Sequence, residues 1–468
     1  MFSDTDNKDN RSEILSQPAS PSSDNDATTG KNKKAGYAQP QSARDLGNEL
    51  EINFDEDDLP TKTATKTTRK SFGVNYITAA PAPSSAPLSL MLDSDTDFLA
   101  LLDCFYRRLF PFREFYRWLS YGLVQRNYFQ NRELSFTLAS DSYLRFQSFK
   151  DGEELKHRIL ELKPVKIDIG AVYNAKPKEK KSIQEGRFNA LERELVFDID
   201  MTDYDPIRGA DICLKCWDFM TVSIKILDRA LEAEKNKKDF HRAEDFGFKH
   251  RLWVYSGRRG VHCWVCDDRA RKLNVEARRA IVSYLEVVKG GDENSKKVSL
   301  SSKSTHPAIR EAEKILGPIF TTRLINNQDI LTSPEKYEKL LQLIPDEELK
   351  KRLRSSWENK NKRPVEKWSE IMGETQALSK KKPALAATLQ EILFNYSYPR
   401  LDSNVSIGLN HLLKAPFCVH PKTGRVCIPI DQKYCDSFNP FQAPKVFDLI
   451  NEISAYDSAH VGGPSVPG

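Results

Sequence analysis

The chain has 468 residues, of which 39% are hydrophobic and 29% charged, a composition that suits a soluble globular protein of two or three domains with a disordered part. The formal net charge is only +5, so a basic surface for nucleic acid must be local. No apolar run is long enough to cross a bilayer, and 8 cysteines in so long a chain indicate reduced thiols or a metal site rather than a disulfide framework.

Residues 1–92 read as a polar N-terminal tail. They are rich in Ser, Asp, Thr, Asn, Lys, Ala and Pro and hold few apolar clusters, so we expect them to be disordered. The first residues show neither the basic nor the apolar region of a secretory signal. An acidic patch at 55–58 precedes a basic cluster at 62–70, which fits either a solvated tail or a nuclear-import signal.

The folded part begins near residue 97 with an amphipathic helix. Leu102, Phe105, Tyr106 and Leu109 recur at helical spacing, and Pro111 ends the pattern. Three predicted strands follow, at 133–138, 143–149 and 165–169.

Charged residues interrupt these predicted strands. Arg145 needs an anionic partner if it is buried in a sheet. Lys166 and Asp168 alternate with apolar residues on the third strand, and a structural salt bridge explains them as well as a site does. The lysine-rich stretch 173–190 reads as a surface loop, with contact to a phosphate backbone as the alternative.

The most informative run is 194–200, where strand-forming residues end in two carboxylates. Side chains of a strand alternate between its faces, so we expect Asp198 and Asp200 on one face and Ile199 in the packing. Two neighbouring carboxylates repel each other unless a cation neutralises them, and hard ions such as Mg²⁺ or Mn²⁺ take oxygen ligands. The alternative for an isolated Asp-x-Asp is an exposed strand end with solvated acids.

A cysteine pair comes directly after this run. Cys213-x-x-Cys216 has the spacing of half a zinc knuckle, but the same loop holds no second pair. Cys263 and Cys266 lie in a predicted strand, where residues three apart face opposite sides and chelate poorly. The spacing therefore leaves both zinc and free thiols open.

Residues 251–267 predict a hairpin, because two apolar strands flank Gly257-Arg258-Arg259-Gly260. Glycines let backbone amides approach an anion, and arginines provide fork-shaped donors for phosphate. Ser256 and His262 add further donors. The pattern is not a Walker A loop, and both a triphosphate site and a solvated basic turn fit it. Two adjacent arginines in a tight turn favour the phosphate.

The second half of the chain is mainly helical before it returns to the core. Asn274 is predicted to cap a helix that ends at Gly290-Gly291, and Ser333 to open another. We expect a helix at 410–414 and a hairpin at 417–430. The predicted domains are a tail at 1–92, a core at 93–303, a helical insertion at 304–392, the rest of the core at 393–456 and a disordered tail at 457–468.

Three motifs in this order resemble the small, catalytic subunit of eukaryotic-type DNA primase, in the archaeo-eukaryotic primase superfamily. They are 196–205 (VFDIDMTDYD), 256–262 (SGRRGVH) and the Leu-Asp, His-Leu-Leu-Lys and His of 401–420. The similarity covers roughly residues 97–452. It implies an α/β prim fold with mixed β-sheets and flanking helices, and a DNA-templated RNA polymerase that makes primers de novo for DNA replication.

The resemblance carries roles over position by position. It implies that Asp198, Asp200 and Asp402 hold the metal ions and that Glu133 is needed for catalysis. The implied nucleotide-binding residues are Arg145, Lys166, Asp168, Ser256, Gly257, Arg258, Arg259, Gly260, His262, His411, Lys414 and His420. A structural zinc is also implied, with Cys213 and Cys216 among its ligands, but the family's other cysteine pair has no counterpart at 205–211.

The same resemblance implies cofactors and partners. These are two Mg²⁺ or Mn²⁺ ions, ribonucleoside triphosphates, a single-stranded DNA template, a large primase subunit with an iron–sulfur cluster, and the DNA polymerase alpha complex in the nucleus. Two other functions stay open from the residues: a related primase-polymerase that works in repair or damage bypass, and a non-catalytic nucleic-acid-binding subunit.

Overall fold

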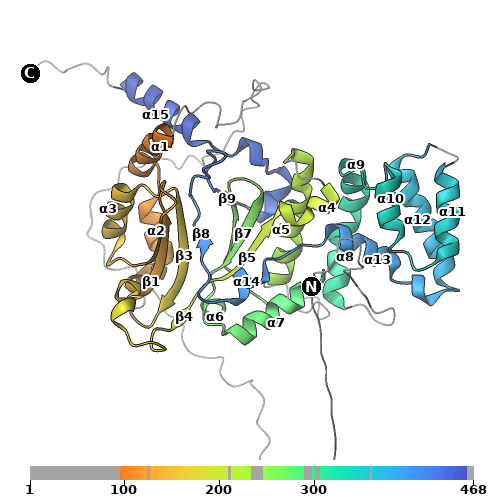
Figure 1. Cartoon of the computed structure of the whole chain (residues 1–468), viewed down its shortest axis with the longest axis horizontal. Coiled ribbons are helices and arrows are strands. Elements are labelled where there is room, and N and C mark those ends of the chain that lie inside the picture. The colour runs from red at the N-terminus through yellow and green to blue at the C-terminus, as the bar shows by residue number, and fades with distance from the viewer. Residues whose placement is uncertain are drawn as a thin grey trace, which may run out of the picture. The chain divides into compact units, whose positions relative to one another are not determined.

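The computed structural model describes residues 95–123, 127–208, 212–232, 246–288, 298, 300, 306–358 and 361–460 (Figure 1). The predicted tail at 1–92 and the predicted helix end at Gly290-Gly291 lie outside the described residues. Helices and two sheets occur together in the described part, which confirms the α/β fold class. None of the described helices is both long enough and apolar enough to cross a membrane.

The first sheet has the strand order β2-β1-β3-β4, and β8 also pairs with β3. Its strands are β1 (Arg132–Thr137), β2 (Tyr143–Gln147), β3 (Lys166–Tyr173), β4 (Ala190–Glu192) and β8 (Leu413–Lys414). Buried residues of β1 and β3, such as Phe136 and Ile167, share a core with the first three helices. These helices are α1 (Asp95–Arg108), α2 (Phe112–Leu119) and α3 (Gly152–Leu162) (Figure 1).

The second sheet has the order β5-β7-β6-β9. Its strands are β5 (Leu195–Asp200), β6 (Arg251–Tyr255), β7 (Gly260–Val265) and β9 (Pro429–Ile430). The predicted hairpin is confirmed, since β6 and β7 pair directly on either side of the turn at 256–259. In the β5–β7 pair, Asp198 lies opposite His262 and Asp200 opposite Gly260.

The two faces of β5 meet different surroundings. Leu195, Phe197 and Ile199 are buried in the core that includes helix α5 (Asp218–Leu231). Val196 instead belongs to the core shared with the first sheet. Because strand side chains alternate, Asp198 and Asp200 continue the face of Val196, toward the first sheet. The predicted packing of Ile199 is thereby confirmed.

Every pairing between these named strands is antiparallel, so the expectation of sheets with mixed strand directions is wrong. The connections explain this result. The β1–β2 and β6–β7 links are short turns, which join antiparallel neighbours, whereas parallel neighbours need long crossovers.

The helices between residues 275 and 397 share the core of α5 and the second sheet. Asn274 caps α7 by accepting a hydrogen bond from the Ala277 N–H, and Ser333 caps α10 in the same way through Lys336, as predicted. The described residues of 306–397 form no strand. The helices not yet given are α4 (Asp205–Arg208), α6 (Asp268–Arg271), α7 (Val275–Leu285), α8 (Pro307–Ile319), α9 (Ile325–Asn327), α10 (Pro334–Leu341), α11 (Glu347–Glu358), α12 (Pro364–Ser379) and α13 (Thr388–Ser397).

Two expectations for the C-terminal part are wrong. The stretch 410–414 is not a helix: it ends in strand β8, and the helix α14 (Ser403–Ile407) comes earlier because Asp402 caps it. The helix α15 (Val446–His460) continues into the stretch 457–468 that was expected to be disordered. Its Asp457 forms two hydrogen bonds with Arg108 of α1, at 2.9 and 3.0 Å, a tertiary contact with no local sequence signal.

Candidate active site

Three carboxylates come together where the second sheet faces the first. The backbone N–H of Asp402 donates to the Asp198 carbonyl at 3.1 Å, which seats the start of α14 against the end of β5. Burial, together with the negative charges of Asp200 and Asp402, raises the pKa of Asp198 to about 6. The third acid, Asp402, therefore lies within electrostatic reach of Asp198 despite its distance along the chain.

One oxygen of each carboxylate is engaged. The Oδ1 of Asp200 accepts hydrogen bonds from the Thr202 backbone and hydroxyl, both at 2.8 Å. The Oδ1 of Asp402 accepts from the first N–H groups of α14, and the Oδ1 of Asp198 lies 3.5 Å from the His262 Nε2. Within the described part of the chain, the three Oδ2 atoms accept no hydrogen bond.

This donor set fits a hard divalent cation, because three carboxylates crowd one another and each keeps an oxygen unengaged. The described residues contain no group of three His, Cys, Asp or Glu side chains that is already arranged around a common metal position. The chemistry of the site therefore suits Mg²⁺ or Mn²⁺, while its side chains are arranged by hydrogen bonds of their own.

A basic cavity of about 270 Å³ opens beside the acids. Its lining contains Asp198, Asp200, Lys166, Ser256, Arg258, Arg259, His262, Val405, Leu412, Leu413, Lys414 and His420. It thus joins residues that the sequence placed in three separate motifs. Carboxylates and cationic side chains in one lining suit a ligand that carries both metal and phosphate.

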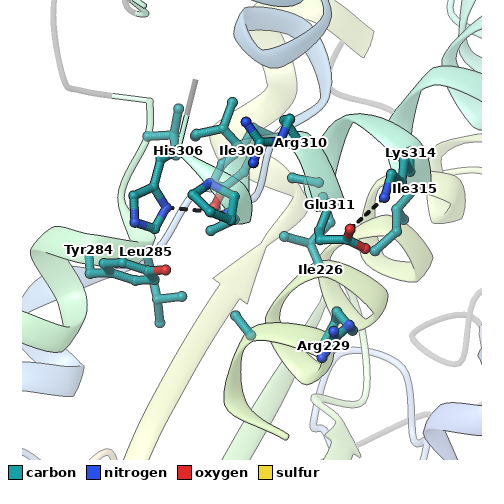
Figure 2. Close-up of a pocket in the computed structure, with 16 residues that line it drawn as sticks. Ile226, Arg229, Tyr284, Leu285, His306, Ile309, Arg310, Glu311, Lys314 and Ile315 are labelled. Carbon is teal, nitrogen blue, oxygen red and sulfur yellow. Dashed lines mark hydrogen bonds and ion pairs between the residues drawn. The ribbon is translucent and has the colours of Figure 1, made fainter. Parts of the chain in front are cut away.

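Another cavity, of about 450 Å³, is larger but chemically less specific (Figure 2). It lies between α5, α7 and α8, and its lining is mostly apolar. The only carboxylate among its lining residues, Glu311, is paired with Lys314 at 2.6 Å. We therefore assign the candidate active site to the smaller cavity, where several charged groups converge.

Two glycines shape the turn at 256–260. Gly257 has a φ of +91°, and a Cβ there would lie 2.7 Å from the Cβ of His420. A Cβ at Gly260 would lie 2.4 Å from the Ile199 carbonyl oxygen, where β7 meets β5. Both positions therefore need a residue without a side chain.

The two histidines of the cavity are neutral at physiological pH. Burial and the nearby Lys414 lower the pKa of His262 to about 3. Burial, Lys414 and Arg258 lower the pKa of His420 to about 3 as well. The Nδ1 of His420 accepts from the Lys422 N–H at 3.2 Å, so its Nε2 carries the proton and acts as a neutral donor.

Glu133 and Arg145 lie outside the cavity lining. Glu133 is fully buried and accepts from Arg145 at 3.0 and 3.3 Å, from the Phe146 N–H at 3.2 Å and from the Tyr173 hydroxyl at 3.0 Å. With both oxygens so occupied, Glu133 holds Arg145 rather than meeting a ligand. Arg145 in turn donates to the Asn410 carbonyl at 3.3 Å, in the segment that leads to β8.

Two more predicted residues act from outside the lining. Asp168 is buried and lies 3.0 Å from the Nζ of Lys166, so it orients a lysine that does line the cavity. His411 is exposed, and its ring lies beside Gly408. A Cβ at position 408 would be 2.5 Å from the Cδ2 atom of that ring. The structure thus places both residues next to the site without bringing them into it.

The cysteine pair does not fit zinc in the described part of the chain. The sulfurs of Cys213 and Cys216 lie 3.0 Å apart, but their described neighbours are Gln328 at 3.8 Å and the cationic Arg208. Structural zinc takes four ligands. The sequence holds no counterpart of the family's other cysteine pair at 205–211, and residues 209–211 of that stretch lie outside the described residues.

The structure also reveals residues that sequence reasoning missed. Arg193 is fully buried and donates to the carbonyls of Val405 and Gly408, both at 2.7 Å, which ties α14 to the start of β5. Arg400 donates to the Asp203 carbonyl and holds the other side of the same segment. Each arginine donates to backbone carbonyls about 200 residues away, and any residue type can supply a backbone carbonyl. The sequence around each arginine therefore shows no motif.

Acidic side chains and a basic turn with hydrogen-bond donors suited to phosphate share one cavity, an arrangement typical of proteins that bind nucleotides. Residues 197–432 match the family model for the DNA primase small subunit. The DNA primase small subunit of Schizosaccharomyces pombe is 44% identical over 77% of this chain and 80% of its own, and that of Drosophila melanogaster 41% identical over 76% and 82%. That of Pyrobaculum islandicum is 31% identical over 45% of this chain and 62% of its own.

The chain therefore belongs to the DNA primase small subunit family, as its motifs predicted. Membership of this family implies a function in priming DNA replication, a large partner subunit and a DNA template.

Proposed function

We propose that the chain is the catalytic subunit of a primase, a DNA-templated RNA polymerase that makes short RNA primers de novo. The observation that carries this proposal is the shared cavity, whose lining brings Asp198 and Asp200 together with Arg258, Arg259 and Lys414. A polymerase needs both groups, because the carboxylates would hold the divalent ions near the reacting phosphorus and the cationic side chains would bind the triphosphate.

The reaction is nucleotidyl transfer. The 3′-hydroxyl of the growing primer gives its proton to solvent and its oxygen forms a bond to the α-phosphorus. The bond from that phosphorus to the β-phosphate oxygen breaks, and pyrophosphate leaves. Asp198, Asp200 and Asp402 would hold two divalent ions, which would supply Lewis-acid chemistry to the attacking oxygen and the phosphate.

The cationic side chains of the cavity stabilise the leaving pyrophosphate. Arg258 and Arg259 present planar donor forks that match phosphate oxygens, and Lys414 adds a point charge. Negative charge accumulates on pyrophosphate as its bond breaks, so these fixed cations stabilise the transition state more than the ground state. His420 adds a neutral donor beside them.

In this proposal Glu133 acts indirectly, by positioning another side chain. Its carboxylate fixes Arg145, which holds the 410 segment and through it β8 and Lys414. Asp168 does the same for Lys166. We propose no role for zinc, because the described donors near Cys213 do not complete a site.

We further propose that the template is single-stranded DNA, that the substrates are ribonucleoside triphosphates, and that the protein works in the nucleus. Its large partner subunit is proposed to carry an iron–sulfur cluster and to connect the pair to the DNA polymerase alpha complex. These finer statements are supported by the motif resemblance.

The test replaces Asp198 with Asn. We expect Asp198→Asn to lower the rate of primer synthesis from ribonucleoside triphosphates by more than the ~10–100-fold typical of outer-shell residues near a metal. Fluorescence anisotropy with a single-stranded template should show little change in binding. The matched control is Asp448→Asn, which removes an exposed carboxylate at the start of α15.

Retention of primer synthesis by Asp198→Asn would favour a non-catalytic nucleic-acid-binding subunit. Failure of the wild-type protein to form a dinucleotide without a primer, together with extension of a supplied primer, would favour a bypass polymerase.

A further inference from the structure

The turn that carries the two arginines is held by its carbonyl groups. Four successive carbonyl oxygens each accept a hydrogen bond from outside the turn or from the strand before it. The pairs are Ser256 with Lys414 Nζ at 2.6 Å, Gly257 with Thr423 Oγ1 at 2.7 Å, Arg258 with Tyr255 Oη at 3.2 Å and Arg259 with Met201 N at 3.0 Å.

Fixed carbonyls also fix the N–H groups of the following residues. A peptide unit is planar and its N–H points away from its C=O, so each tethered carbonyl turns the next N–H to the opposite side. The N–H groups of Gly257, Arg258 and Arg259 donate to no described residue. Successive unpaired N–H groups beside a residue of positive φ form an anion-binding nest, and Gly257 supplies that φ.

The hydroxyl of Thr423 is oriented to hold the Gly257 carbonyl. Its Oγ1 accepts from the Arg425 N–H at 3.2 Å, so its own hydrogen is left to donate to the Gly257 carbonyl. Tyr255 is buried under the turn and donates to the Arg258 carbonyl. Neither residue lines the cavity, and neither belongs to the basic motif.

We propose that Thr423 and Tyr255 are positioning residues for the triphosphate. Their hydroxyls hold the peptide planes after Gly257 and Arg258, which directs the backbone N–H groups and the two arginine side chains to the phosphate oxygens. This inference rests on the proposed function, in that the anion it describes is the triphosphate of the incoming nucleotide.

The test uses Thr423→Val and Tyr255→Phe, which remove one hydroxyl each and keep the shape of the side chain. We expect each to weaken binding of inorganic tripolyphosphate, measured by calorimetry without template or turnover, by about 3- to 10-fold, the effect of one lost neutral hydrogen bond. The KM for ribonucleoside triphosphates should rise by the same factor. Thr423→Ser keeps the hydroxyl and should restore both values.

The matched control is Thr332→Val, which loses a hydroxyl that donates to the Asp329 carbonyl at 2.8 Å, away from the cavity. It should bind tripolyphosphate like the wild type. Wild-type affinity in both Thr423→Val and Tyr255→Phe would overturn the proposal, and so would a wild-type protein that does not bind tripolyphosphate. Tripolyphosphate binding is measured without primer synthesis. If the chain proved not to be a polymerase, the binding data would still test the roles of Thr423 and Tyr255.

Discussion

At the scale of single residues, the site is built at the expense of stability. Burial and the negative charges of Asp200 and Asp402 destabilise the ionised form of Asp198 and raise its pKa to about 6. An acid with a raised pKa opposes folding whenever it is ionised. Structural carboxylates in the same protein behave in the opposite way: Arg132 pairs with the buried Glu194 at 2.9 Å, and the pKa of Glu194 falls to about 2.

This difference predicts a pH-dependent gain in stability for Asp198→Asn. In the unfolded chain the carboxyl ionises near its ordinary pKa of 3.8, but in the folded protein only near 6. The wild type therefore loses stability from this group as the pH rises from about 4 to 6, and the loss persists above that range. The asparagine variant escapes it and should be more stable by about 1–3 kcal/mol at pH 7.5.

Urea denaturation of both proteins in metal-free buffer, at several values between pH 4 and 7.5, measures the difference. Comparison at each pH removes contributions from groups that the two proteins share. An advantage that is already complete at pH 4, or that is absent at pH 7.5, would contradict a clustered acid at this position.

At the scale of elements, the β5–β7 pair determines where the acids point. The two strands are in register from Leu195 opposite Val265 to Asp200 opposite Gly260. The ladder needs a glycine at its end because the Ile199 carbonyl oxygen occupies the space of a Cβ. A side chain there would push apart the strands that place Asp200 beside Arg259, whose guanidinium lies 3.5 Å from the carboxylate.

Gly260→Ala should therefore lower the free energy of unfolding by roughly 1–3 kcal/mol, the range typical of overpacking, and reduce primer synthesis as well. Chemical denaturation measures the first and a primer assay the second. Gly373→Ala is the matched control, since that glycine lies in α12 with no atom near its missing Cβ. The control should be neutral or more stable by up to about 1 kcal/mol. Equal stability of Gly260→Ala and the control would refute the close approach.

At the scale of the whole molecule, the site depends on a link between distant parts of the chain. Arg193 precedes β5 and holds the two carbonyls at the end of α14, the helix that Asp402 opens. No carboxylate neutralises it directly: its Nε and Nη2 find no partner among the described residues. Burial, with the neighbouring Arg278, lowers the pKa of Arg193 to about 9. A buried cation this poorly paired favours a positioning role over a purely stabilising one.

Arg193→Met should thus affect activity more than stability. Two hydrogen bonds are lost, but so is the cost of burying a charge, so we expect the free energy of unfolding to change by less than about 2 kcal/mol. Primer synthesis should fall by about 10-fold or more, because a carboxylate that drifts by ~1 Å loses its alignment. The exposed Arg363→Met serves as a control for loss of an arginine. A stability loss above this range with activity per folded molecule unchanged would assign Arg193 to the fold alone.

Local patterns carried much of the structure. Alternation along 195–200 and the paired glycines around Arg258 and Arg259 were enough to predict β5, the hairpin and the face shared by two acids. The capping residues Asn274 and Ser333 were predicted from side-chain chemistry within one helical turn. These features are decided by neighbours in sequence, and so the sequence by itself determines them.

Only the tertiary structure decided which acids meet and which are already satisfied. Glu133 and Asp402 are both carboxylates in short motifs. The Glu133 carboxylate is saturated by Arg145, Phe146 and Tyr173, whereas Asp402 is held beside Asp198 by the hydrogen bond that its backbone N–H donates to the Asp198 carbonyl. The predicted helix at 410–414 failed for the same reason, since β3 pairs with Leu413 and Lys414 and imposes a strand. Long-range hydrogen bonds and the packing of two sheets leave no periodic trace in the sequence, so they become visible only once the chain has folded.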